Sequence, residues 1–551
     1  MRLQPTTILL AIFSALSAVN CYASKPTAMW VSTDHYHSPT AAMEAIASMD
    51  IVAWRGERAS AQLLVYTAEE ALNMECSVGK FRSKRATLPA TIAELRIVRH
   101  TIAAAPNSDA TTLVGDLLEN GNCFSTTQEH TQPLWLTISV PQDAEPGIYT
   151  SEVVITFNGK GKIRLPLTLE VQPYTLATPD KWSYHLDLWQ HPTAVARAEG
   201  LELWSDAHFE ALKRDMTPLA NAGQKVITAT LNKDPWNHQC YDGYEAMIRW
   251  TRHADDSWSY DYTIFDRWVE LMFSLGIDKM INCYSMVPWN CELEYYDEAT
   301  DALITVVAEP GTEVFTAMWR PFLVDFKAHL EAKGWLSKTN IAMDERSPEA
   351  MDAAVELLTE CAPEMGFAIA DMHQSYKRYL NMRDVCVAQE QPADHADILS
   401  RRAEGFTTTF YICCNPAFPN TFTTSQPFEA ELLGWYGLAL DYDGMLRWAY
   451  NSWPANPACD SRYGNWTSGD TFLVYPYARS SVRFERLIDG IEVAEKVRTL
   501  RAMGVDISEV EAALEAIRTA DINDPTQPWI EILTDAREAL NRASSESREQ
   551  R

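Results

Sequence analysis

The chain has 551 residues, with 46 Lys and Arg against 75 Asp and Glu, and a formal net charge of −29 at pH 7. This excess of negative charge repels phosphate groups, so nucleic acids and anionic membrane surfaces are poor candidate partners. A composition of 46% hydrophobic and 22% charged residues is typical of a globular protein and argues against disorder. The 18 Trp and 22 Tyr residues suit contacts with flat, half-apolar ligands such as sugars.

The first 23 residues have the features of a secretory signal peptide. Arg2 provides a positive charge, residues 8–19 are apolar, and Cys21 and Ala23 place small side chains before Ser24. The apolar run is too short to span a bilayer, and no later stretch is long enough, so no membrane insertion is expected. We therefore expect a soluble protein exported to the periplasm or the exterior. Lipoprotein anchoring through Cys21 is a less favoured alternative.

Residues 28–175 are predicted to form an N-terminal antiparallel β-sandwich. Short alternating segments are separated by turn residues, and the clearest strands are 61–66, 134–140, 147–157 and 163–171. Cys76 and Cys123 are the only cysteines of this region after the signal peptide, and we expect them to pair, since disulfides persist in an exported protein.

Residues 180–480 are predicted to form a (β/α)8 TIM barrel, which makes the fold class α/β. Eight β-rich apolar runs alternate with amphipathic stretches such as 208–221, 265–275, 319–333 and 348–361. A doubly wound open sheet is the competing fold, but no GxGxxG or phosphate-binding turn follows any strand. The predicted strands are 183–187, 225–230, 280–284, 340–344, 366–371, 384–388, 407–412 and 444–450.

The remaining residues, 481–551, are predicted to be a helical tail that packs against the barrel. Residues 510–520 and 529–542 have the clearest helical pattern. Neither the barrel nor the tail contains a CxxC pair or a Cys/His cluster, so no metal site and no cofactor are expected. The adjacent Cys413 and Cys414 point to opposite faces if they lie on a strand, and in that case they do not pair with each other.

The chemistry of such a barrel lies at the carboxyl ends of its strands. Acidic and amide groups dominate these ends, and the sharpest feature is the consecutive pair Asp344 and Glu345 before the helix start Ser347-Pro348. Glycosidic cleavage requires two acids, one to protonate the leaving oxygen and one to handle the positive charge of the sugar. Adjacent acids suit a variant in which a 2-acetamido group of the substrate is the nucleophile. The structural alternative is an acidic loop beside a helix N-terminus.

Seven groups of motifs along the chain resemble glycoside hydrolase family 123. They are 54–62 (WRGERASAQ), 132–136 (QPLWL) with 146–149 (PGIY), 186–192 (LDLWQHP), 344–346 (DER), 448–453 (WAYNSW), 469–470 (GD) with 473–476 (LVYP), and 483–490 (RFERLIDG). The resemblance covers nearly the whole mature chain. The related, uncharacterised domain 4091 family shares several of these motifs.

The resemblance implies a retaining exo-β-N-acetylgalactosaminidase that acts on a β-GalNAc-terminated glycoconjugate. The family's catalytic pair maps onto Asp344 and Glu345. Glu345 is expected to act as general acid and then as general base, while an ionised Asp344 accepts a hydrogen bond from the acetamido N–H.

Six further residues are expected to bind the substrate. Trp448 and Trp453 are expected to stack on the pyranose ring, and Tyr411 to donate to the acetamido carbonyl. Asp187 and Asp371 are expected to bind ring hydroxyls, with Asn451 adding an amide.

Two alternatives stay open from the sequence. A conventional retaining glycosidase would use Glu345 as acid and a carboxylate such as Asp371 as nucleophile, on sugars without a 2-acetamido group. A non-catalytic glycan-binding protein would share the scaffold, although the intact pair of Asp344 and Glu345 argues against it.

Overall fold

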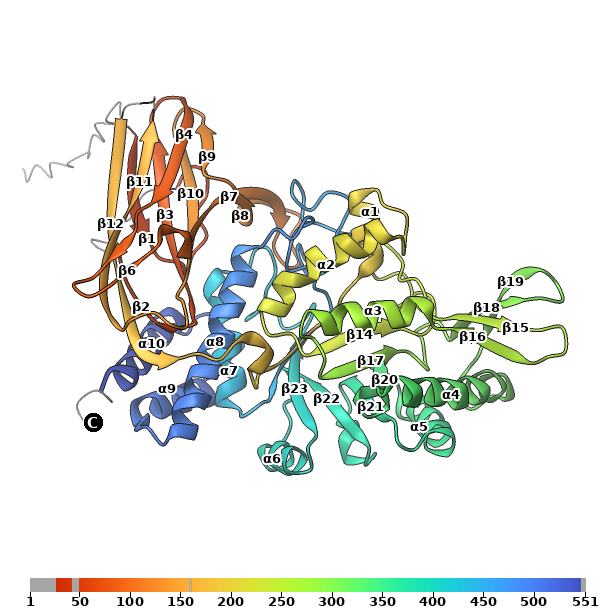
Figure 1. The fold of residues 1–551 in the computed structure, drawn as a ribbon. Coiled ribbons are helices and arrows are strands. Elements are labelled where there is room, and N and C mark those ends of the chain that lie inside the picture. The colour runs from red at the N-terminus through yellow and green to blue at the C-terminus, as the bar shows by residue number, and fades with distance from the viewer. Residues whose placement is uncertain (1–25, 42–48, 158, 160, 547–551) are drawn as a thin grey trace, which may run out of the picture.

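The computed structural model describes residues 26–41, 49–157, 159 and 161–546, and in it a β-sandwich precedes an eight-stranded barrel and a group of helices (Figure 1). The predicted signal peptide lies outside the described residues. None of the helices in the described part of the chain has both the length and the apolar character that a bilayer crossing requires.

The sandwich consists of two mainly antiparallel sheets, as predicted. The strands predicted at 134–140, 147–157 and 163–171 correspond to β10, β11 and β12. One sheet has the order β1 (Thr27–Val31), β3 (Arg58–Thr67), β10 (His130–Ser139), β7 (Ala93–Ala104), β8 (Thr111–Asn120). The other has the order β2 (Met49–Arg55), β12 (Gly161–Thr175), β11 (Gly147–Phe157), β4 (Ala71–Val78), β9 (Cys123–Thr126), with the short β5 (Phe81–Arg82) and β6 (Thr87–Leu88) beside β11.

The expected disulfide between Cys76 and Cys123 is absent from this sandwich. Both residues are free thiols. They lie on the neighbouring strands β4 and β9, but the register places Cys123 opposite Glu75 rather than opposite Cys76. Buried among apolar residues, the Cys76 thiol has its pKa raised to about 12.

The barrel is built from eight parallel strands, and its prediction is confirmed strand by strand. The order around the barrel is β13 (His185–Leu188), β24 (Gly444–Arg447), β23 (Thr407–Ile412), β22 (Met382–Ala388), β21 (Gly366–Asp371), β20 (Thr339–Asp344), β17 (Met280–Tyr284), β14 (Val226–Thr230). The barrel closes where the Lys225 N–H donates to the Leu186 carbonyl at 2.9 Å and the Leu188 N–H to Gln224 Oε1, also at 2.9 Å.

Helices pack around the outside of the barrel, and four of them begin at a side chain that caps the first turn. Ser205, Thr312, Ser347 and Ser481 each accept a hydrogen bond from a backbone N–H of the helix that follows, which fixes the start of that helix. The helices are α1 (Pro192–Glu199), α2 (Asp206–Asn221), α3 (Thr263–Ser274), α4 (Glu313–Lys333), α5 (Pro348–Cys361), α6 (His395–Ala403), α7 (Pro427–Ala439), α8 (Val482–Met503), α9 (Ser508–Thr519) and α10 (Trp529–Glu546). Short 3₁₀ turns lie at Ala90–Ile92, Pro179–Lys181, Leu336–Lys338 and Ser375–Lys377.

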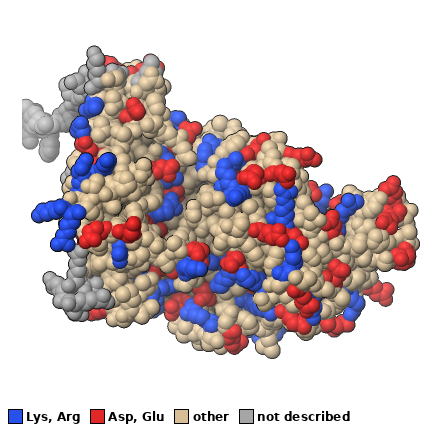
Figure 2. Space-filling model, viewed as in Figure 1, with Lys and Arg blue, Asp and Glu red and all other residues tan. Residues whose placement is uncertain are grey.

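A second, four-stranded sheet extends from the barrel and was not predicted. It combines a hairpin inserted after β14 with one inserted after β17, and acidic side chains lie at its outer end (Figures 1 and 2). Its inner face packs on α4, where Trp250 stacks on Phe322 with ring centroids 4.5 Å apart. Its strands in spatial order are β16 (Trp258–Asp261), β15 (Arg249–Arg252), β18 (Glu292–Asp297) and β19 (Ala302–Val307).

The sandwich is attached to the barrel through α8. Strand β10 of the sandwich packs on its own core with one face and against α8 with the other. Leu134 and Leu136 point into the sandwich core, whereas Trp135 packs against Val482 of α8. Both faces of β10 are therefore buried, and the apolar run 133–136 in its centre contributes residues to both of them.

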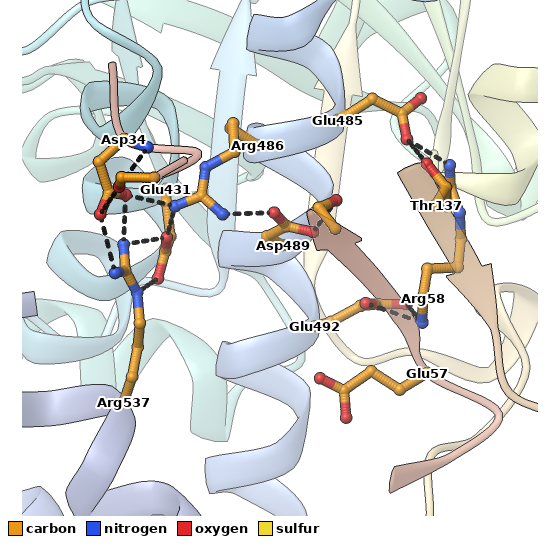
Figure 3. Close-up of polar contacts among 12 residues, drawn as sticks. Asp34, Glu57, Arg58, Thr137, Glu431, Glu485, Arg486, Asp489, Glu492 and Arg537 are labelled. Atoms are coloured by element: carbon orange, nitrogen blue, oxygen red, sulfur yellow. Dashed lines mark hydrogen bonds and ion pairs between the residues drawn. The ribbon is translucent and has the colours of Figure 1, made fainter. Parts of the chain in front are cut away.

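Buried ion pairs join the two domains along α8 (Figure 3). On one side, Arg486 pairs with Asp34 at 2.9 Å and with Glu431 of α7, and Arg537 of α10 reaches the same two carboxylates. On the other, Glu485 pairs with Arg58 of β3 at 2.7 Å. These contacts fix the sandwich on the barrel, since a buried charge is stable only with a partner.

Candidate active site

The catalytic pair predicted from the sequence lies where β20 ends. Asp344 is the last residue of β20, and Ser347 begins α5 three residues later by accepting a hydrogen bond from the Ala350 N–H. Between them, Glu345 has a φ of +48°, a left-handed conformation that is costly for a residue other than glycine. Consecutive side chains of a strand point in opposite directions. Because Glu345 leaves the strand in this conformation, both carboxylates line one cavity.

Asp344 is the more enclosed of the two acids. Burial and the neighbouring Glu345 raise its pKa to about 7, although the Arg346 guanidinium and hydrogen bonds from Trp289 and Trp236 act in the opposite direction. Arg346 is held in place by a hydrogen bond from its Nε to the Asp344 carbonyl at 2.9 Å, and its guanidinium lies over the Trp289 ring at 5.0 Å. The ionisation of Asp344 is thus set mainly by its burial and adjusted by the charges of Glu345 and Arg346.

Glu345 has a different partner. The hydroxyl of Tyr411, near the end of β23, donates a hydrogen bond to Glu345 Oε1. Burial and this carboxylate raise the pKa of Tyr411 well above its ordinary value, so the phenol stays protonated and acts as a donor. The Glu345 N–H donates to the Ala370 carbonyl of β21 at 2.9 Å, which anchors the backbone at the same point.

Tryptophan side chains from four separate segments form the walls of the cavity. Trp189 follows β13, Trp289 follows β17, Trp448 follows β24, and Trp466 comes from the long connection before α8. The Trp448 Nε1–H donates to Asp470 at 3.0 Å, and the Trp466 Nε1–H donates to the Gln239 carbonyl at 3.0 Å. These bonds fix the rings and leave apolar faces for a sugar.

An aromatic layer lies against the innermost part of this cavity. Trp189, Trp236 and Tyr284 have ring centroids 4.8 to 5.0 Å apart. Their burial removes water from the side of Asp344 that faces the barrel, and this desolvation is the largest cause of its raised pKa.

Two of the six predicted binding residues, Tyr411 and Trp448, line the cavity with the catalytic pair. The structure places two of the others, Asn451 and Trp453, in the protein interior. Asn451 is fully buried and bonds to the backbone of His191 through both atoms of its amide, at 2.8 and 3.0 Å. Trp453 is 1% exposed, and its Nε1–H donates to the Val474 carbonyl at 2.6 Å. Their hydrogen-bonding groups are thus already used within the protein.

The two predicted strand-end acids also lie outside the lining of the cavity. Asp187 is buried inside the barrel, where desolvation and Asp384 raise its pKa well above its ordinary value. Asp371 caps the turn after β21, where its carboxylate accepts hydrogen bonds from the backbone N–H groups of His373 and Ser375. Asp371 therefore acts as a turn-stabilising acid in this structure.

Sequence reasoning missed Trp189, Trp289, Trp466 and Gln239, which line the cavity. Trp189 directly follows the last residue of β13, so the strand-end rule that selected Tyr411 also points to it. Trp289, Trp466 and Gln239 lie in long connections, where no periodic pattern gives their position.

Cys413 and Cys414 also line the cavity, as free thiols. The expectation that they point to opposite faces assumed that they lie on a strand, but β23 ends at Ile412, and their sulfur atoms are 3.8 Å apart. As for metals, the described residues contain no group of three or more His, Cys, Asp or Glu side chains placed to hold an ion.

Two family models match the chain. The model for the glycoside hydrolase 123 catalytic domain matches residues 189–500, and the model for the glycoside hydrolase 123 N-terminal domain matches residues 30–157. No curated protein matches the sequence.

A strong similarity is found among the solved structures. A family 123 glycoside hydrolase from Clostridium perfringens, analysed for glycolipid glycan hydrolysis, superposes with a TM-score of 0.87 at 25% identity, over 95% of this chain and 99% of that one. A GH5 xyloglucanase from Bacteroides ovatus aligns over 84% of this chain and 100% of its own at 10% identity, with a TM-score of 0.30. A GH20 exo-β-N-acetylglucosaminidase from Vibrio harveyi aligns over 83% and 98% at 10% identity, with a TM-score of 0.27. Scores this low do not indicate a shared fold.

Proposed function

The chain belongs to glycoside hydrolase family 123, and from this premise we propose that it is an exported retaining exo-glycosidase that removes terminal β-linked N-acetylgalactosamine with help from the 2-acetamido group of the substrate. The observation that carries the proposal is the placement of Asp344 and Glu345 on one aromatic cavity with different partners. Two neighbouring acids in unlike surroundings are suited to different protonation states, as a divided catalytic role requires.

In the first step of this mechanism, Glu345 protonates the glycosidic oxygen while the acetamido carbonyl oxygen bonds to the anomeric carbon. The glycosidic bond breaks, the leaving group departs with the proton of Glu345, and a bicyclic oxazolinium forms. Asp344, ionised, accepts the hydrogen bond of the acetamido N–H and so stabilises the positive charge that develops there. In the second step, Glu345 takes a proton from a water molecule whose oxygen attacks the anomeric carbon. The acetamido group is regenerated, and the configuration is retained.

The surroundings of Asp344 set the pH range in which it can play this role. With its pKa raised to about 7, Asp344 is ionised above that pH, and a substrate N–H adds a donor that favours the charged form. Arg346, Trp289 and Trp236 favour it too. The Tyr411 hydroxyl, expected on the acetamido carbonyl, donates instead to Glu345, so we assign it to positioning the acid.

A conventional mechanism with Asp371 as nucleophile has less support, because its oxygens are bonded to the turn after β21. The glycolipid glycan hydrolysis studied for the Clostridium perfringens enzyme supports a glycan as the natural substrate here. Export is part of the proposal on the strength of the N-terminal sequence, and an exported protein whose N-terminal residue is Ser24 would support it.

The mechanism is tested by two inhibitors of opposite design. A thiazoline analogue of N-acetylgalactosamine resembles the bicyclic intermediate and should bind far more tightly than the free sugar. Asp344→Asn should weaken it strongly, because a charge-assisted bond to the ring nitrogen is lost. A fluorinated sugar that traps glycosyl esters should leave the protein mass unchanged. A covalent adduct on a carboxylate, with the thiazoline inert, would replace this mechanism with the conventional one.

A further inference from the structure

Two free thiols lie side by side on the wall of the catalytic cavity. Cys413 and Cys414 follow the last residue of β23, and both line the cavity that holds Asp344 and Glu345. Their sulfur atoms are 3.8 Å apart, with Cys413 partly buried and Cys414 exposed. The glycosidase mechanism uses neither thiol, so this pair of reactive atoms at the active site has a chemistry of its own.

The loop that carries the two thiols is anchored on the protein side. The Cys413 N–H donates to the Asn415 carbonyl at 3.0 Å. The Asn420 side-chain amide donates to the carbonyls of Cys413 and Pro416, at 2.9 and 2.7 Å. The Cys413 side chain also packs against the aromatic layer beneath the cavity. These contacts hold the two sulfur atoms close to each other at the surface of the cavity.

The two thiols differ in the way that thiol–disulfide exchange requires. A thiolate is the attacking species, so exchange begins at the more acidic and more accessible thiol. The hydrogen bond between the two side chains lowers the pKa of Cys414 to about 7 and raises the pKa of Cys413. Cys414 is therefore suited to attack first. Once Cys414 has reacted, Cys413 loses the hydrogen bond that is the largest cause of its raised pKa, and it can attack second.

The charges around the pair favour one class of oxidant. The carboxylates of Asp470 and Glu345 act on Cys414, and the whole chain has a net charge of −29. A cationic reagent is attracted to such a site and an anionic one is repelled. A small disulfide with amino groups, such as cystamine, should therefore react faster here than oxidised glutathione, which is anionic.

We propose that a small cationic disulfide converts Cys413 and Cys414 into a vicinal disulfide, and that this oxidation reversibly inhibits the enzyme. The Cys414 sulfur attacks one sulfur of cystamine, and one cysteamine leaves. The Cys413 sulfur then attacks the Cys414 sulfur, and the second cysteamine leaves. The two cysteines lose two electrons and two protons, and cystamine takes up both. The exchange is independent of the proposed function, whereas the inhibition rests on it.

The geometry of consecutive residues explains both the inhibition and its reversal. Their Cα atoms are about 3.8 Å apart, whereas a disulfide usually joins Cα atoms about 4.4–6.8 Å apart, so the bond is strained and easily reduced. The sulfur atoms must approach from 3.8 Å to about 2.0 Å, which shifts the cavity wall. Tyr411, which donates a hydrogen bond to Glu345, lies only two residues before Cys413, so the shift should reach the catalytic acid.

The first test is mass spectrometry of reduced protein that has been treated with cystamine. Trypsin releases residues 403–447 as one peptide, which contains Cys413, Cys414 and no other cysteine. In the wild type this peptide should lose two hydrogen atoms, and dithiothreitol should restore them. A peptide that keeps both thiols, or one that keeps a cysteamine as a lasting mixed disulfide, would overturn the proposal.

Two comparisons test the order of attack and the charge preference. Cys413→Ser removes the thiol that completes the exchange, so Cys414 should keep one cysteamine as a mixed disulfide. Formation of the vicinal disulfide in the wild type should be at least about tenfold slower with oxidised glutathione than with cystamine. An unmodified Cys414 in the variant, or equal rates with the two reagents, would contradict the proposed exchange.

The second test measures kcat/KM for an aryl β-N-acetylgalactosaminide before and after treatment. Oxidation should lower it at least about tenfold, because a misplacement of about 1 Å near the reacting groups can cost about 10²-fold, and dithiothreitol should restore it. Cys123 and Cys459 are also exposed thiols, so the double variant Cys123→Ser, Cys459→Ser is the matched control and should respond like the wild type. The double variant Cys413→Ser, Cys414→Ser should give the same value before and after treatment.

Unchanged activity of the oxidised wild type, or an equal loss in the variant without Cys413 and Cys414, would overturn the inhibition. A reduced wild-type protein that does not hydrolyse the aryl glycoside would count against the proposed function. The mass measurement would then still decide whether the pair is oxidised.

Discussion

At the scale of single residues, Glu345 combines two features that its neighbours do not share. Its backbone is left-handed, with φ at +48°, and its carboxylate accepts a hydrogen bond from Tyr411. The first feature turns the side chain toward the cavity that Asp344 also lines, and the second fixes its direction. A strained residue held by specific partners is common at catalytic sites, where the cost is offset by the rest of the fold.

Glu345→Gln should abolish turnover of substrates with poor leaving groups, because no group remains to protonate the departing oxygen. We expect kcat to fall by about 10²-fold to 10⁴-fold. Steady-state assays on a disaccharide will measure this fall. The loss should be smaller on an aryl glycoside whose leaving group needs little protonation. Undiminished activity on the disaccharide would remove Glu345 from the mechanism.

The pH dependence of kcat/KM should follow the ionisation of Asp344. Since this residue must be ionised to act and its pKa is raised to about 7, kcat/KM should fall as the pH drops below about 7. Arg346 lowers the pKa of Asp344, so Arg346→Met should move this acid limb to higher pH, while Arg346→Lys, which keeps the charge, should move it less. An acid limb that stays at the same pH in Arg346→Met would show that another group controls it.

At the scale of helices and strands, the barrel could be predicted because its strands are short apolar runs with clear ends. The runs 280–284, 366–371 and 407–412 coincide with β17, β21 and β23. The inserted four-stranded sheet was missed because strands such as Arg249–Arg252 and Trp258–Asp261 are only four residues long and mix charged with aromatic residues. Their pairing depends on contacts with α4 and between distant segments, which a local pattern does not contain.

The candidate site could be predicted from the sequence only where its residues lie at the ends of barrel strands. Asp344, Glu345 and Tyr411 occupy or directly follow strand ends, and the barrel rule found them. Asp371 occupies a strand end as well, but its carboxylate caps the following turn, a use that sequence position alone does not distinguish. Trp466 lies in the connection between β24 and α8, which has no periodic pattern.

The crossing of α7 and α8 depends on two glycines facing each other. A Cβ added to Gly434 would lie 2.4 Å from the backbone of Gly490. One added to Gly437 would meet side-chain atoms instead, the nearest being a ring atom of Phe410 at 3.0 Å. Gly434→Ala should therefore lower the free energy of unfolding by about 1–3 kcal/mol, through overpacking against backbone that cannot yield. Gly437→Ala, with the same change in helix propensity, should cost less. Urea denaturation compares the two, and equal midpoints would contradict the close packing of the helices.

At the scale of the whole molecule, the motif resemblance to glycoside hydrolase family 123 is confirmed by family models that match both domains. The motif at 483–490 is now explained, because Glu485 and Arg486 of α8 anchor the sandwich through Arg58 and Asp34. Residues that were quoted as a family signature thus serve to join the domains.

Arg486→Met should destabilise the protein strongly. It removes the buried cation that Asp34, Glu431 and Asp489 share and leaves Arg537 to pair with the first two alone. Breaking such a pair from one side costs about 3–5 kcal/mol. Arg542→Met is the matched control, because Arg542 pairs with Glu509 and Glu538 at the surface and should leave the unfolding midpoint unchanged. Similar midpoints for both variants in thermal unfolding would mean that the interdomain ion pairs contribute little.

Participation of the substrate's acetamido group in the reaction can be checked by measuring hydrolysis of two aryl glycosides that differ only in that group. We expect release of the aryl alcohol from the β-N-acetylgalactosaminide and none from the β-galactoside, since the galactoside has no internal nucleophile to assist Asp344 and Glu345. Hydrolysis of the galactoside at a comparable rate would contradict substrate assistance and indicate a nucleophile on the protein. Hydrolysis of neither would indicate a glycan-binding protein.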